Sequence, residues 1–131
     1  MNSRALSRFD AVPWDVIAAR FEARTAGSPE YSFMRDVVAS IQVSAGDRLA
    51  GFTSMYDLAV TSVPVPSEGP VDVVWVRPQI YESADNPDVL IEHHAVTGHD
   101  DRIVRPGTDA VRLFWRFVIE KYGIEPATPA A

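Results

Sequence analysis

The sequence predicts an α+β domain, in which an antiparallel sheet of about four strands follows two N-terminal helices and precedes one buried C-terminal helix. The element order is α-α-β-β-β-β-α. Apolar residues recur with helical spacing before residue 46 and after residue 108, and they alternate with polar residues in much of the chain between. The connections between the predicted strands are short, which favours antiparallel neighbours.

Two N-terminal helices are expected from the spacing of apolar residues and from helix-start signals. The first should cover residues 12–24, where Trp14, Ile17 and Phe21 lie on one apolar stripe. A second should cover residues 29–44, because Ser28 can cap a helix whose first position is occupied by proline. Gly46 is then expected to end this helix in the left-handed conformation.

The middle of the chain predicts four strands, at residues 52–60, 71–76, 89–96 and 102–105. Strand 71–76 carries apolar residues on both faces, with Val73 and Trp75 on one and Val74 and Val76 on the other. It should therefore be central, and a second layer must cover each face of the sheet. If three helices cover one face only, a second copy of the chain should cover the other, so we expect a homodimer in that case.

The last helix is expected at residues 109–122, and its nearly continuous apolar surface predicts that it lies buried across the sheet. A length of 131 residues suits one core, so residues 1–131 should form a single domain. Residues 1–9 and 125–131 are expected to be loose, and the polar segment 81–88 should be an exposed loop.

Composition excludes several classes of chemistry. The chain has no cysteine, which excludes disulfides, thiolate metal ligands and a cysteine nucleophile. It has neither the apolar run of a secretory signal nor a stretch of ~20 apolar residues, so we expect a soluble, cytoplasmic protein without membrane contact. We recognise no family, and the common phosphate-loop, dinucleotide and hydrolase motifs are absent.

Charge is distributed unevenly along the chain. Residues 51–101 carry only Arg77 against nine acidic residues, whereas the first 50 residues are balanced and the last 30 are slightly basic. Because an acidic segment repels phosphate backbones, nucleic-acid binding is not expected. A basic protein partner fits better, although the acids could also serve only to solvate loops and the outer sheet face.

All three histidines lie in one cluster of reactive side chains, and this cluster supplies the candidate catalytic residues. Glu92 and His94 share a face of their strand, and Asp57 could join them from a neighbouring strand. Such a group could perform general acid–base catalysis. A cross-strand ion pair between Glu92 and Arg105 is a purely structural alternative.

A metal site built from His94, Glu92 and His99 is a further alternative, since imidazole and carboxylate are common metal ligands. Adjacent strand residues point to opposite faces, so His93 and His94 cannot easily share an ion, and His99 should lie at a hairpin tip. We therefore expect no metal and no cofactor.

Trp75 and Tyr56 are the candidate ligand-binding residues, because aromatic side chains could line a pocket between helices and sheet. The alternative is that such aromatic residues fill the core.

Two functional hypotheses follow. The first is a non-catalytic protein-interaction or binding module, of the antidote or regulatory type, that acts on a basic protein partner or by self-association. The alternative is a small-molecule-binding domain or an enzyme that uses the histidine–carboxylate pair, with or without a metal ion. The sequence leaves open whether the protein is an enzyme.

Overall fold

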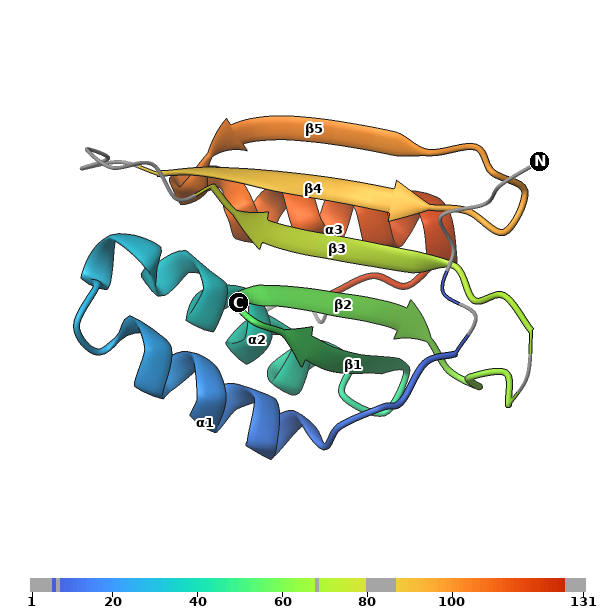
Figure 1. Cartoon of the computed structure of the whole chain (residues 1–131), viewed down its shortest axis with the longest axis horizontal. Helices are drawn as coiled ribbons and strands as arrows, with labels where there is room; N and C mark the ends of the chain where they lie inside the picture. The colour runs from blue at the N-terminus through green and yellow to red at the C-terminus, as the bar shows by residue number, and fades with distance from the viewer. Residues whose placement is uncertain (1–5, 7, 68, 80–86, 127–131) are drawn as a thin grey trace.

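The computed structural model describes residue 6 and residues 8–67, 69–79 and 87–126. It confirms the α+β class, with three helices and an antiparallel sheet whose spatial order is β1-β2-β3-β4-β5 (Figure 1). In chain order the elements are α1 (Trp14–Thr25), the short 3₁₀ turn η1 (Pro29–Tyr31), α2 (Ser32–Ser44), β1 (Leu49–Ser54), β2 (Asp57–Ser62), β3 (Val73–Pro78), β4 (Asp88–His94), β5 (Asp101–Pro106), the 3₁₀ turn η2 (Gly107–Asp109) and α3 (Ala110–Tyr122).

The sheet has five strands because the strand predicted at residues 52–60 is in fact a hairpin. Strand β1 pairs with β2 in a register that places Phe52 opposite Ala59 and Ser54 opposite Asp57. Two residues, Met55 and Tyr56, turn the chain, and Met55 has a positive φ of 58°. Neither residue is a typical turn former, so the sequence shows no break in its alternation here.

All three helices pack on one face of the sheet, and helices α2 and α3 lie behind the strands in Figure 1. Their apolar stripes meet the strand side chains of that face in one core, which includes Val74, Val76 and Ile91. The indole N–H of Trp115 in α3 donates to Ser40 Oγ in α2 at 2.9 Å. In the described part of the chain, no helix is both long and apolar enough to cross a membrane.

The opposite face of the sheet is covered in part by the N-terminal segment, which the sequence predicts to be loose. Leu6 exchanges backbone hydrogen bonds with Val71, and Phe9 packs edge-on against Phe52 with their ring centroids 4.8 Å apart. Phe52 in turn packs edge-on against Trp75, which is only 6% exposed. Both faces of β3 are therefore covered, as its two apolar faces predict.

Two of the predicted helix ends differ in detail. Ser28 makes no side-chain capping bond, and residues 29–31 form a 3₁₀ turn before α2 begins. Gly46 is not among the residues with positive φ, because α2 already ends at Ser44 with Ala45 as its cap. Gly123, in contrast, is left-handed with a φ of 67°, and its N–H donates to the carbonyl of Ile119, which ends α3.

Trp14 fixes α1 to the edge of the sheet. Its indole N–H donates to the carbonyl of Leu49 at 2.9 Å, and its ring lies directly over Gly51. A side-chain carbon at Gly51 would come 2.6 Å from the Cη2 atom of that ring, so only glycine allows this close approach.

We predict that Gly51→Ala destabilises the protein by about 1–3 kcal/mol, because the added methyl group forces the Trp14 ring out of place. Urea denaturation followed by tryptophan fluorescence measures the change. Gly27→Ala is the matched control, since no atom lies within 4 Å of the methyl group it adds. Equal stability of the two variants would contradict the packing role of Gly51.

Candidate functional site

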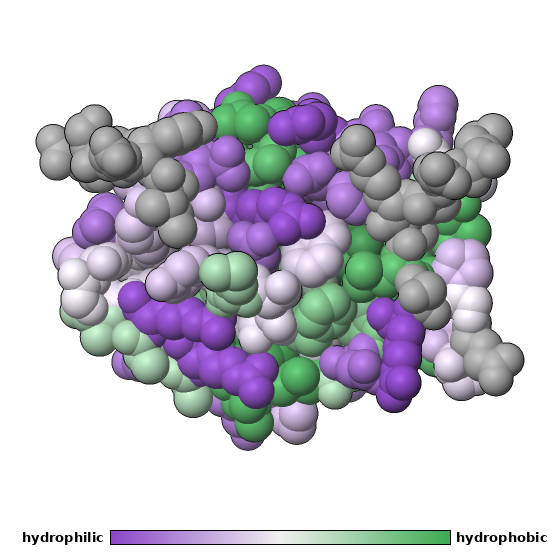
Figure 2. Space-filling view, viewed as in Figure 1, coloured by the Kyte–Doolittle hydropathy of each residue, from purple (hydrophilic) through white to green (hydrophobic). Residues whose placement is uncertain are grey.

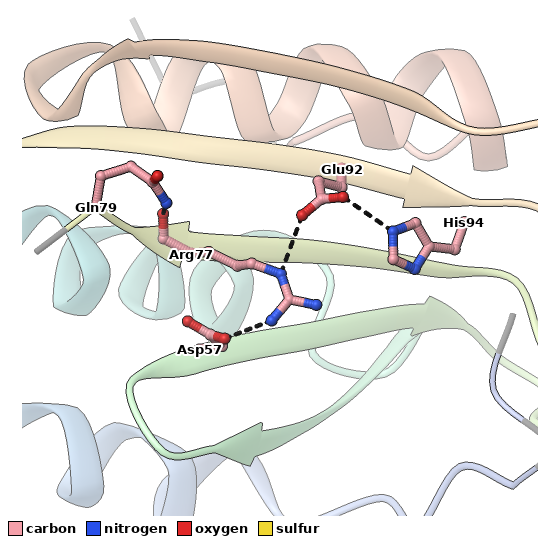
Figure 3. Close-up of polar contacts among 5 residues, drawn as sticks. All are labelled: Asp57, Arg77, Gln79, Glu92 and His94. Atoms are coloured by element: carbon pink, nitrogen blue, oxygen red, sulfur yellow. Dashed lines mark hydrogen bonds and ion pairs between the residues drawn. The ribbon is translucent and has the colours of Figure 1, made fainter. Parts of the chain in front are cut away.

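An ion-pair network joins three neighbouring strands on the helix-free face of the sheet (Figure 3). Arg77 of β3 lies at its centre, with Nη1 2.5 Å from Asp57 Oδ2 on β2 and Nε 3.2 Å from Glu92 Oε1 on β4. The second carboxylate oxygen of Glu92 lies 3.0 Å from His94 Nε2. The structure thus brings together all three predicted catalytic candidates, Asp57, Glu92 and His94, around a residue that was not predicted.

The network also covers the aromatic layer beneath it. The guanidinium carbon of Arg77 lies 4.2 Å from the centre of the Trp75 ring, which is close enough for a cation–π interaction. Hydrophilic and hydrophobic residues are intermingled over this face of the molecule (Figure 2). Arg77 therefore has a packing role in addition to its ion pairs.

Burial and charge affect the two carboxylates differently. Burial raises the pKa of Asp57 above its usual value and outweighs the hydrogen bond and the charge of Arg77, which lower it. Burial also acts to raise the pKa of Glu92, but the hydrogen bond from His94 and the charge of Arg77 outweigh it, so the pKa of Glu92 is lowered. Glu92 is thus the better stabilised anion of the network.

The hydrogen bond to Glu92 orients the imidazole of His94. Because an ionised carboxylate only accepts hydrogen bonds, Nε2 carries the proton and Nδ1 of the neutral ring is left as the acceptor. This arrangement is the one that general base catalysis requires. However, the side chains of His94 and Glu92 are only 9% and 12% exposed, and none of the three described pockets includes either residue.

The structure does not bring the three candidate metal ligands, His94, Glu92 and His99, together. No group of three histidine, aspartate or glutamate side chains in the described ranges is arranged to hold a metal ion. Glu92 and His94 are paired with each other, whereas His99 lies in the exposed connection between β4 and β5 and does not join them.

His93 points to the helix side of the sheet. It is buried, its ring packs edge-on against Tyr122 of α3 at 6.2 Å, and neither ring nitrogen has a hydrogen-bond partner. Burial lowers the pKa of His93 below 6.5, so the ring is neutral at neutral pH.

Two expectations from the sequence, the ion pair of Glu92 with Arg105 and a pocket shared by Trp75 and Tyr56, differ from the structure. Glu92 lies opposite Arg102 in the β4–β5 pair, while Arg105 lies opposite Val89. This follows from the register of the two strands, in which Asp101 at the start of β5 lies opposite His93. Trp75 and Tyr56 do not line a common pocket: Trp75 lies on the helix-free face, whereas Tyr56 lies at the tip of the β1–β2 hairpin. Tyr56 lines a pocket beside α1.

A groove of about 660 Å³ lies where η1 and the start of α2 meet the junction between β5 and α3. Glu30 and Asp36 are its charged residues, and both are exposed to solvent. Neither carboxylate has an ion-pair partner among the described residues. The remaining lining residues are uncharged: Pro29, Ser32, Phe33, Pro87, Pro106, Gly107, Thr108 and Val111.

Sequence reasoning missed Arg77, Glu30 and Asp36. A signal for Arg77 was present, because it is the only basic residue among nine acids in residues 51–101 and follows Trp75 on the same strand face. No comparable signal exists for Glu30 and Asp36, whose groove is completed by residues distant in the sequence.

No protein-family model matches this sequence, and no curated protein or solved structure matches it closely enough to indicate a relative. Functional inference therefore rests on the geometry of the chain.

We predict that Arg77→Met destabilises the protein by about 1–3 kcal/mol, because it leaves two partly buried carboxylates without their cation. The expected loss is smaller than for a fully buried pair because Arg77 and Asp57 are partly exposed to solvent. Thermal and urea denaturation measure the loss.

Arg105→Met is the control for charge, since Arg105 is exposed and its only described side-chain bond is to the adjacent carbonyl of Val104. It should change stability by less than about 0.5 kcal/mol. Similar losses in both variants would show that the network contributes nothing specific.

We predict that His93 makes the protein less stable as the pH falls below about 6.5. Its folded-state pKa is lowered, so the unfolded chain takes up the proton first, and stability is lost as pH falls towards the folded value. In His93→Phe, the fall in stability between about pH 7 and pH 5 should be smaller than in the wild type. An unchanged pH dependence would refute this role, and His99→Asn, at an exposed position, is the control.

Proposed function

We propose that the chain is a non-catalytic interaction module that binds a basic segment of a partner protein, as an antidote or regulatory subunit would. The observation that carries the proposal is the groove between η1, α2 and the β5–α3 junction. It is the largest described pocket, it is lined by two carboxylates, and no basic residue lines it.

The charge of the groove selects the chemistry of the partner. Glu30 and Asp36 flank an otherwise uncharged surface and have no cation of their own among the described side chains. An arginine or lysine side chain that enters the groove could form a charge-assisted hydrogen bond with either carboxylate. The aromatic floor formed by Phe33 suits the apolar stem of such a side chain.

The walls of the groove are built from residues that restrict backbone motion. Pro29, Pro87 and Pro106 each fix one φ angle. Gly107 donates its N–H to the carbonyl of Pro87 at 2.9 Å, and it packs so closely on Phe33 that a larger residue would overlap the ring. A rigid groove loses little conformational entropy when a segment binds, which favours recognition.

The placement of the catalytic candidates supports binding rather than catalysis. Asp57 and Glu92 form ion pairs with Arg77, and His94 is hydrogen-bonded to Glu92, so these groups already contact one another. A general base needs space for a substrate within hydrogen-bond reach, and no described pocket includes His94 or Glu92.

Self-association stays a prediction. The two apolar faces of β3 favour it. However, Val73 and Trp75 on the helix-free face are already buried within one chain, so covering them does not require a second copy. The groove, in contrast, is open and asymmetric in charge, so a basic partner is the occupant we propose.

We predict that an arginine-rich nonapeptide with interspersed alanines binds in the groove, and that the double variant Glu30→Gln/Asp36→Asn weakens its binding at least about tenfold. Fluorescence anisotropy with a labelled peptide measures affinity, and backbone NMR shifts at Ser32 and Thr108 locate the peptide.

The matched control is Glu22→Gln/Asp47→Asn, which changes the net charge equally at exposed positions outside the groove. It should alter affinity by no more than about twofold if the groove is specific. Equal weakening in both double variants would mean that the peptide follows net charge alone, and absence of binding to the wild type would also overturn the proposal.

A further inference from the structure

A second pocket, of about 290 Å³, lies beside the C-terminal half of α1, and a cationic side chain lines it. It is enclosed by α1, the start of α2, the tip of the β1–β2 hairpin and Pro78 at the end of β3. Its volume is near the lower limit for small-molecule sites, about 300–1,000 Å³. It is separate from the groove proposed for a protein partner, and the two share no lining residue.

The cation is Arg24. Its guanidinium carbon lies 5.6 Å from the centre of the Phe21 ring and 5.9 Å from that of Tyr56, so the two rings hold the charged group. Its Nη1 atom is buried without a hydrogen-bond partner, and Arg24 belongs to none of the described ion pairs. A charged group without a described counter-ion is costly to bury, and an anion bound in the pocket that the half-buried Arg24 lines would supply a counter-ion.

The rest of the pocket is suited to an apolar body. Phe21 and Met34 form a fully buried floor, and Tyr31 and Tyr56 lie at the sides. The hydroxyl of Thr25 donates its hydrogen to the carbonyl of Phe21 at 2.8 Å, so it is not available as a hydrogen-bond donor to a ligand. None of the described residues that line the pocket is acidic.

We infer that this pocket binds a small carboxylate with an aromatic or compact apolar body, the carboxylate pairing with Arg24 and the body resting on Phe21 and Met34. A guanidinium and a carboxylate form charge-assisted hydrogen bonds in a fixed planar geometry, which gives the site its selectivity. The net charge of −6 makes general attraction of anions unfavourable, so a preference for an anionic ligand must come from the local site.

The test uses 3-phenylpropionate as the probe and 3-phenylpropanamide as its uncharged counterpart, each titrated into the full chain by NMR. The carboxylate should bind at least about tenfold more tightly than the amide and shift the backbone signals of Thr25, Ser28 and Tyr31. Equal affinity for the two compounds, or no saturable shift with the carboxylate, overturns the inference.

Arg24→Gln should abolish the preference for the carboxylate, while Arg20→Gln should retain it. Arg20 lies on the same helix, but it is exposed and donates to Thr53 Oγ1 at 3.0 Å outside the pocket. Arg24→Gln removes a cation that has no ion-pair partner among the described residues, so the fold should persist, and its melting temperature checks this. Retained preference in Arg24→Gln contradicts the assignment whatever the peptide experiment on the groove shows.

Discussion

Strand β3 buries apolar side chains on both faces of the sheet, and most of the structure serves to cover those two faces. On one side Val74 and Val76 pack under the helices. On the other side none of the described helices is present, and Trp75 is covered by Phe52, by the guanidinium of Arg77 and by the aromatic layer that Phe9 completes. The two coverings differ in kind, since one is an apolar helical layer and the other combines a terminal segment with charged side chains.

This second covering places the reactive residues of the sheet in contact with one another. A guanidinium placed over an indole needs counter-ions because it is partly removed from water, and Asp57 and Glu92 supply them from the two adjacent strands. Glu92 then retains one oxygen for His94. Asp57, Glu92 and His94 are thereby held in contact with one another through Arg77.

The sequence predicted the parts of the fold that depend on local periodicity. Helices α1 and α3 and the central position of β3 followed from the spacing of their apolar residues. The β1–β2 hairpin did not, because Met55 and Tyr56 turn the chain without glycine, proline or asparagine, and the alternation of residues 52–60 continues through the turn. Strand alternation places Glu92 and His94 on one face, where they are in contact, whereas the contact of Asp57 with Arg77 depends on strand register, which no local pattern encodes.

The proposed groove and the pocket of Arg24 lie on the two sides of the short turn η1. Glu30 lines the groove and Tyr31 lines the pocket, although they are consecutive residues, and Phe33 and Met34 at the start of α2 divide in the same way. Glu30 and Arg24 therefore have opposite charges on nearby elements, yet they form no ion pair. Because η1 directs the acid to one side and α1 places the base on the other, neither neutralises the other, which is the arrangement that the two proposed binding sites require.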